Sequence, residues 1–337
     1  MDDPELAEKL VEVLRRPDGD TALRPVHTFG VSATGYFEPS DIAQQFCIAD
    51  HFRAKRAPVI ARFSNGSGSA TQRDGWSDVR GMATRFHLSD GTATDLIAMT
   101  LPEFFTATPE AFLDFAIEAA PAPYEAETPW RKVVNLLQLK LPKRDPYRGE
   151  TISPDDGAIR FADANRSAQL AVVEAATIGA PVSYVRAAYH AVHTFVVTAP
   201  DKTRRWVRFT WQPVAGVLNT NPLEPPVDDY LKAELQERLS KEPARFSLMM
   251  NIGEVGDAFD DPTRPWPPHR PRITMGTLTL DAVPDDQDAQ CEKLSFNPGL
   301  LTEGIEPSDD PVLHIRTQAY KTSSEWRDGT PCPFSRS

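Results

Sequence analysis

Alternating apolar and polar positions divide the chain into two strand-rich blocks with helical segments between and around them. The first block contains runs rich in β-branched and aromatic residues, which favour strands, at 27–38, 57–68 and 79–100. A second set of such runs lies at 182–199, 204–216 and 271–284. The Ser-Asp-Gly cluster at 89–91 separates two runs of strand length and therefore predicts a hairpin. The first block therefore predicts mostly antiparallel β-structure, and the second predicts a further β region.

Helical patterns flank and interrupt these blocks. A Thr-Pro pair opens each of two helical segments within 107–143, and proline is favoured in the first turn of a helix. A further helical insertion is predicted at 228–242 and a last helix at 310–326. Because the start of the chain has the pattern of an acidic amphipathic helix, we predict an N-terminal helix at 1–23 followed by one domain at 24–337.

Charge and cysteine content narrow the class of protein. The net charge of −12 argues against nucleic acid as a partner, because lysine and arginine supply most of the affinity for phosphate backbones. The three cysteines, Cys47, Cys291 and Cys332, form no C-x-x-C pair, so we expect neither a zinc site nor a disulfide framework. No stretch approaches the roughly 18 apolar residues of a membrane span, and no secretion signal is evident. These features predict a cytoplasmic protein without a membrane partner.

Two short patterns carry candidate chemistry. Arg316 and Tyr320 are four residues apart in the predicted last helix, so their side chains lie on one face. A guanidinium beside a phenol favours the phenolate, which is a hard anionic ligand suited to ferric iron. Near the N-terminus, Arg24 and His27 precede Gly30 in a strand-like run, and glycine in a strand often marks the close approach of a bulky group. Taken alone, these patterns more commonly mean a solvated helix face and a packed strand histidine.

Six segments together resemble the heme catalase family, in the family's order and over roughly residues 24–327. They are RPVHTFGVSATGYFE, APVIARFSNGSG, SDVRGMATRFHLSDGTATDL, LPEFFTATPEAFLDF, YHAVHTFVV and FNPGLLTEGIEPSDDPVLHIRTQAY. The resemblance implies an α+β fold in which a closed antiparallel β-barrel of about eight strands is flanked by α-helices. It also implies heme held between the barrel wall and the helix that carries Tyr320.

The same resemblance implies roles for four residues at the cofactor's iron. Tyr320 matches the tyrosinate ligand of the ferric iron of heme b, and Arg316 matches the residue that keeps the phenol ionised. His27 matches the general acid and base on the distal face, where a neutral imidazole accepts a proton from one peroxide oxygen and returns it to the other. Ser64 matches the serine that hydrogen-bonds the histidine ring.

Further residues match positions around the cofactor. Three arginines are implied to bind the heme propionates, because a guanidinium fork pairs with a carboxylate through two hydrogen bonds; they are Arg24, Arg62 and Arg327. Val26 is implied to narrow the channel above the iron, and Phe104 and Phe112 to pack near the heme. The alternatives are surface salt bridges for the arginines and plain core packing for the phenylalanines.

Two departures separate this chain from full-length catalases. Met99 stands where the family has an asparagine that hydrogen-bonds peroxide. Because His27 lies close to the first residue of the sequence and Tyr320 close to the last, we also expect a chain without the family's long N-terminal arm or C-terminal helical domain, a pattern that resembles the small catalase-related peroxidases. We therefore expect an oxidoreductase, a monomer or homodimer, that reduces hydrogen peroxide or organic hydroperoxides with an organic reductant and has weak catalase activity. The alternatives are rearrangement of fatty-acid hydroperoxides, as in allene oxide synthases, which Val26 disfavours, and a non-catalytic heme carrier or sensor.

Overall fold

The structure, a computed structural model, describes residues 3–15, 22–66, 73–120, 122–123, 128–141, 143, 146, 152–153, 155–224, 226, 229–287 and 292–328. Parts of four predicted segments fall outside the described residues, namely 1–23, 24–337, 107–143 and 228–242. Two of the cysteines, Cys291 and Cys332, also lie outside the described residues. Among the described residues, no helix is both long and apolar enough to cross a membrane.

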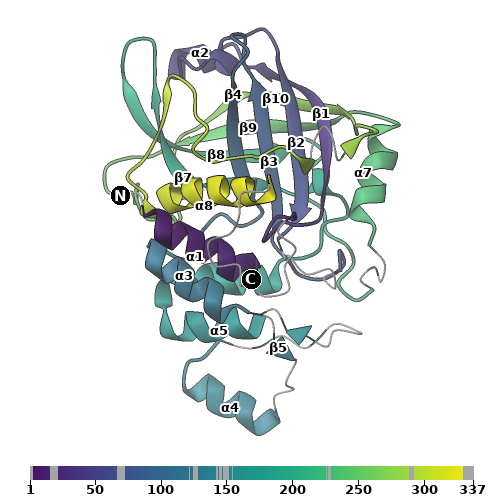
Figure 1. Ribbon diagram of the computed structural model, residues 1–337, viewed down its shortest axis with the longest axis vertical. Coiled ribbons are helices and arrows are strands. Elements are labelled where there is room, and N and C mark those ends of the chain that lie inside the picture. The colour runs from purple at the N-terminus through teal and green to yellow at the C-terminus, as the bar shows by residue number, and fades with distance from the viewer. Residues whose placement is uncertain are drawn as a thin grey trace.

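Within the described part of the chain, eight antiparallel strands close into a barrel (Figure 1). Their order is β7-β4-β3-β2-β1-β10-β9-β8, and the pairing of β8 with β7 closes the ring. They are β1 (Gly30–Pro39), β2 (Ala57–Asn65), β3 (Arg80–His87), β4 (Ala93–Met99), β7 (Tyr189–Thr198), β8 (Arg204–Pro213), β9 (Ala244–Ile252) and β10 (Arg272–Ala282). A short strand, β11 (Ile305–Pro307), also pairs with β7, and β5 (Ala122–Pro123) pairs with β6 (Ile152–Ser153). The predicted α+β fold around a closed antiparallel barrel is confirmed.

Aromatic side chains fill the inside of the barrel. Phe37, Phe86 and Trp211 are fully buried and pack ring against ring, with the centroids of Phe37 and Phe86 5.4 Å apart. Successive side chains of a strand point to opposite faces, so the remaining positions of each strand face outward. On β2, β3 and β4 most of those outward positions are buried or half-buried.

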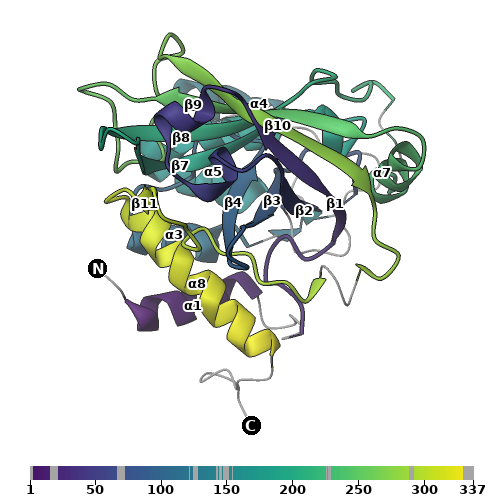
Figure 2. The same ribbon diagram turned by 90° about the horizontal axis from the view of Figure 1, so that it is seen from above.

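Helices cover this outer face. Three of them pack together through an apolar cluster that includes Leu10, Ala116 and Ile315 (Figures 1 and 2); they are α1 (Pro4–Arg15), α3 (Pro109–Glu118) and α8 (Pro311–Arg327). The other α-helices are α2 (Ala43–Phe46), α4 (Pro129–Leu137), α5 (Asp155–Ala164), α6 (Gln169–Thr177) and α7 (Leu231–Leu239). Short 3-10 turns lie at Asp50–Phe52, Arg166–Ala168 and Tyr184–Arg186.

Some local predictions were wrong at their boundaries. The strand expected at 27–38 begins only at Gly30, because His27 has a positive φ of 54° that a strand does not accommodate. The strand expected at 182–199 begins at Tyr189, because Ser183 caps a 3-10 turn that occupies the preceding residues. Strand β9 and helices α5 and α6 lie in segments where the apolar pattern predicted no element.

Candidate active site

A cavity of about 340 Å³ lies where the outer face of β2, β3 and β4 meets α1, α3 and α8. All ten site residues predicted from the sequence line it: Arg24, Val26, His27, Arg62, Ser64, Phe104, Phe112, Arg316, Tyr320 and Arg327. Segments from both ends of the chain therefore meet at one site. Met99, the residue that departs from the family pattern, lines the same cavity.

His27 lies in the loop before β1 and is held on both its backbone and its ring. Its backbone N–H donates to the carbonyl of Gly66 at 3.2 Å, and its Nδ1 lies 3.0 Å from the hydroxyl of Ser64 on β2. Gly81 on β3 lies directly against the ring, since a Cβ at that position would come within 2.8 Å of ring atoms. The predicted contact between His27 and Ser64 is therefore present, and it depends on a neighbouring residue without a side chain.

The imidazole of His27 is uncharged at neutral pH. Burial lowers its pKa to about 4, and the positive charges of Arg62 and Arg316 act in the same direction. Nδ1 is engaged by Ser64, so Nε2 is the ring nitrogen left to meet a ligand. A neutral imidazole with one nitrogen available is suited to accept a proton.

Arg24, Arg62 and Arg327 converge at one end of the cavity, where they share a partner that the sequence did not indicate. The carboxylate of Glu292 accepts hydrogen bonds from Arg24 at 2.6 Å and from two nitrogens of Arg62 at 2.8 and 3.0 Å. The backbone carbonyl of Glu292 also accepts from Arg24 and, at 3.5 Å, from Arg327. Glu292 therefore ties the three arginines together.

The charges in this cluster perturb one another. Burial lowers the pKa of Arg24 to about 9, and the nearby Arg62 contributes to the lowering. Burial alone would raise the pKa of Glu292, but Arg62 and Arg24 outweigh it and hold that pKa below its ordinary value. Three guanidinium groups around one carboxylate leave an excess of positive charge at this end of the cavity.

On α8, the predicted pair of Arg316 and Tyr320 is in contact. The Nη2 of Arg316 donates to the phenolic oxygen of Tyr320 at 3.4 Å. The helix starts at Asp310, whose Oδ1 accepts from the backbone amides of Val312 and Leu313, as an N-cap residue does. The cap fixes where the helix begins and so directs both side chains toward the barrel wall.

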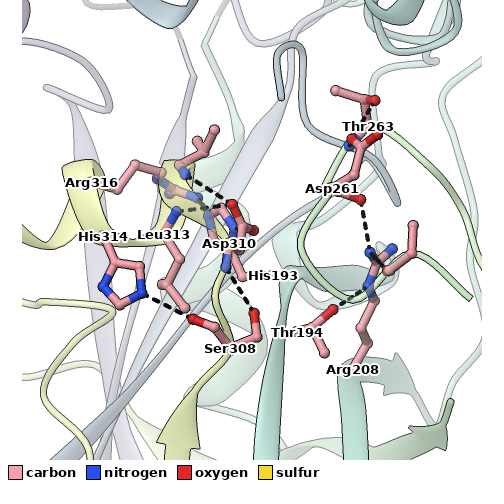
Figure 3. A network of polar contacts seen from close by, with 12 residues as sticks. His193, Thr194, Arg208, Asp261, Thr263, Ser308, Asp310, Leu313, His314 and Arg316 are labelled. Atoms are coloured by element: carbon pink, nitrogen blue, oxygen red, sulfur yellow. Dashed lines mark hydrogen bonds and ion pairs between the residues drawn. The ribbon is translucent and has the colours of Figure 1, made fainter. Parts of the chain in front are cut away.

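Two further residues position Arg316 (Figure 3). His193 on β7 is buried, and its Nε2 lies 2.7 Å from Nη1 of Arg316 while its Nδ1 lies 2.6 Å from Oδ2 of Asp310. Because arginine has only donors, Nε2 is the acceptor, and Nδ1 carries the proton that it donates to Asp310. Burial lowers the pKa of His193, against the opposing effect of Asp310. The sequence segment that contains His193 matched a family motif, but it gave the residue no role.

Aromatic side chains close another side of the cavity. The rings of Phe104 and Phe112 meet edge to face with centroids 5.0 Å apart. Phe104 also lies 5.9 Å from the ring of His193 and 5.1 Å from the guanidinium carbon of Arg316. The two phenylalanines thus both pack against the hydrophobic core and line the cavity.

Similarity to known proteins extends over most of the chain. The family model described as Catalase matches residues 1–136 and 142–332. The catalase-related peroxidase of Mycolicibacterium paratuberculosis is 32% identical over 326 residues, which cover 96% of this chain and 95% of that protein. The catalase-related peroxidase of Synechococcus elongatus is 29% identical over 299 residues, covering 88% of this chain and 81% of that protein.

Solved structures share the fold. A bacterial catalase superposes with a TM-score of 0.74 at 22% identity, over 91% of this chain and 58% of that one. Catalase A from Saccharomyces cerevisiae superposes with a TM-score of 0.73 at 23% identity, over 90% of this chain and 61% of that one. The chain therefore corresponds to about three-fifths of these longer catalases.

Proposed function

Because this chain belongs to the catalase family, we propose that it is a heme-dependent peroxidase that reduces hydrogen peroxide or organic hydroperoxides with organic electron donors and has weak catalase activity. The observation that carries the proposal is the meeting, in one cavity, of the His27–Ser64 pair with the Arg316–Tyr320 pair. The relatives matched over most of their length carry the name catalase-related peroxidase.

The residues of the cavity fit heme b. A porphyrin is a flat apolar ring with two carboxylates at one edge, and the cavity combines apolar walls with a cluster of arginines at one end. We propose that Tyr320 ligates the ferric iron as a tyrosinate and that Arg24, Arg62 and Arg327 bind the propionates. When bound, the heme supplies the redox-active iron that takes oxidising equivalents from peroxide.

His27 would act as the general base and general acid toward the peroxide. Its neutral ring would accept a proton at Nε2 from one peroxide oxygen and would return it to the other oxygen. Ser64 fixes the plane of the ring through Nδ1. The low pKa of His27 keeps it available as a base well below neutral pH.

On the other side of the cavity, the chain His193–Asp310 would hold Arg316 against Tyr320. Arg316 donates to both His193 and Tyr320, so its guanidinium is fixed at two points. A guanidinium held in that place stabilises the ionised phenol, because opposite charge favours the anionic form. Val26 and Phe104 would limit the space above the heme.

An absorption spectrum of the purified heme-loaded protein, recorded before and after peroxide, tests the proposal. We expect high-spin ferric bands, a rapid spectral change with peroxide, oxidation of an organic donor dye, and weak release of dioxygen. Tyr320→Phe should alter the ferric spectrum, whereas Tyr36→Phe, a change on β1 at a residue that does not line the cavity, should not. A heme-loaded protein that shows neither spectral change nor dye oxidation would be a carrier or sensor and not a peroxidase.

A cytoplasmic location and a monomeric or homodimeric state remain predictions from the sequence. Light scattering of the purified protein measures the second directly. The division into a helix at 1–23 and one domain at 24–337 likewise stays a prediction, and limited proteolysis tests it.

A further inference from the structure

A row of directly paired residues crosses the barrel wall beneath the cavity. Ser64 on β2 is opposite Gly81 on β3, and Gly81 is opposite Met99 on β4. Met99 is in turn opposite His190 on β7, and His190 is opposite Thr210 on β8. Because paired residues in neighbouring strands direct their side chains to the same face, the whole row shares one face of the wall.

This face is the one that lines the cavity. Ser64 and Gly81 both contact the ring of His27, and Met99 and His190 are themselves part of the cavity lining. The residues on either side of His190 in the strand, Tyr189 and Ala191, belong to the apolar cluster inside the barrel. Strand alternation therefore directs His190 outward, toward the cavity.

His190 is held as His27 is held. Its Nδ1 lies 3.3 Å from the hydroxyl of Thr210, just as Nδ1 of His27 lies 3.0 Å from the hydroxyl of Ser64. Burial lowers the pKa of His190 to about 4, and Arg272 acts in the same direction, so the ring is uncharged at neutral pH. Nδ1 is thus the engaged nitrogen in both rings, and Nε2 of His190 makes no hydrogen bond to another described residue, so it can meet a ligand.

The two imidazoles are too far apart to serve one peroxide molecule. Neighbouring strands are about 4.8 Å apart, so position 190 lies two spacings, or roughly 10 Å, from position 81, where the ring of His27 packs. Between them stands Met99, which offers no strong hydrogen-bond donor or acceptor. Val192, Phe104 and Phe105 line the same cavity and pack in one apolar cluster with Met99, and these apolar side chains suit an aromatic ring.

We propose that His190 is a specificity-determining residue that hydrogen-bonds, through Nε2, the hydroxyl group of a phenolic electron donor. This inference rests on the proposed peroxidase function, and it names the chemical class of the donor. The aromatic ring of the donor packs against Met99 and Phe104, where sulfur and ring contacts stabilise it. The hydroxyl group then meets a neutral imidazole that is already oriented by Thr210.

Equilibrium binding without peroxide tests the proposal. A methoxyphenol and its methyl ether, which lacks the hydroxyl group, are titrated by calorimetry into the heme-loaded protein. For His190→Leu we expect binding of the phenol to weaken about 3- to 10-fold, as for the loss of one neutral hydrogen bond, and binding of the ether to stay unchanged. His190→Gln, which keeps hydrogen-bonding groups, should recover most of the affinity for the phenol. His87→Leu, at the exposed end of β3, is the matched control and should change neither affinity.

Equal affinity of His190→Leu and the unmodified protein for the phenol overturns the proposal. So does an equal loss for the phenol and the ether, because that result means altered packing and not a lost hydrogen bond. If His190→Leu does not fold, Thr210→Val, which removes the hydroxyl that orients the ring, takes its place and should weaken binding of the phenol but not of the ether.

Steady-state kinetics separate this inference from the proposed function. In His190→Leu the KM for the phenol should rise in step with its dissociation constant, while the KM for peroxide stays the same. A protein that binds the phenol through His190 but oxidises nothing with peroxide would refute the peroxidase function and leave the binding site in place. If the protein is a fully active peroxidase but its affinity for the phenol does not depend on His190, only the proposed phenol site is refuted.

Discussion

The carboxylate of Glu292 bridges Arg24 and Arg62 at the charged end of the cavity, and its removal has an effect that depends on heme. The side chains of Arg62 and Arg24 are 4% and 15% exposed, and that of Glu292 is 28% exposed. Breaking a buried ion pair by removing one partner costs about 3–5 kcal/mol. Solvent reaches Glu292 and reduces this cost, so we expect Glu292→Gln to lower the free energy of unfolding of the heme-free protein by about 2–3 kcal/mol.

Heme binding should reduce that loss. Arg24, Arg62 and Arg327 carry three positive charges, and Glu292 neutralises one of them. Two propionates would neutralise the remaining two charges. With Glu292 present, the net charge of the cluster would therefore be zero in the heme-loaded protein and positive in the heme-free protein. Without Glu292 the propionates meet one more unpaired guanidinium, and heme should bind Glu292→Gln about 3- to 10-fold more tightly than it binds the unmodified protein.

Denaturant titrations of the heme-free and heme-loaded forms measure both effects, and heme titration measures the affinity independently. Glu306→Gln is a suitable control, because Glu306 pairs with Arg204 on the surface with more than half of each side chain exposed; that change should cost less than about 1 kcal/mol in either form. An equal loss of stability in the two forms, or weaker heme binding by Glu292→Gln, would refute the charge-balance argument.

Three further results are expected. His27→Ala should slow the peroxide-induced spectral change by about 10²- to 10⁴-fold and Ser64→Ala by clearly less; stopped-flow absorbance measures both, and unchanged rates would place the chemistry elsewhere. Met99→Asn should raise dioxygen release, measured with an oxygen electrode, by at least about 10-fold, because an oriented hydrogen-bond donor is restored; no increase would show that Met99 does not limit this reaction. Burial lowers the pKa of His27 to about 4 and that of His51 to about 3, so as pH falls from 6.5 toward 4 the unfolded chain takes up protons that the folded chain excludes. The free energy of unfolding should therefore fall in that window by up to about 1.4 kcal/mol per pH unit for each histidine. Denaturant titrations measure this slope, and a slope left unchanged by His51→Phe would contradict the assignment.

What could be predicted from the sequence was local or carried by motifs. Residues four apart on a helix must share a face, so the contact of Arg316 with Tyr320 followed from spacing alone. The strand runs and the hairpin at 89–91 followed from alternation and turn chemistry. The location of His27 could not be predicted from a local pattern, because its positive φ is set by the backbone contact with Gly66 and by the space that Gly81 leaves.

The residues that were missed have partners far away in the chain. Glu292 lies in a segment without helical or strand periodicity, and nothing near it in the sequence indicates that it meets Arg24 and Arg62. The role of His193 depends on Asp310, which belongs to another element and looks in the sequence like an ordinary helix cap.

His190 illustrates the same limit in the sheet. Its pairing with Met99 joins β4 to β7, two strands separated in the described chain by the four α-helices α3 to α6, and a shift of one residue in that register would turn His190 into the barrel interior. The register is fixed by the apolar side chains of Tyr189 and Ala191, which must face inward. Closure of the barrel therefore decides which polar groups reach the cavity, and that information resides in the packing of distant strands and not in any motif.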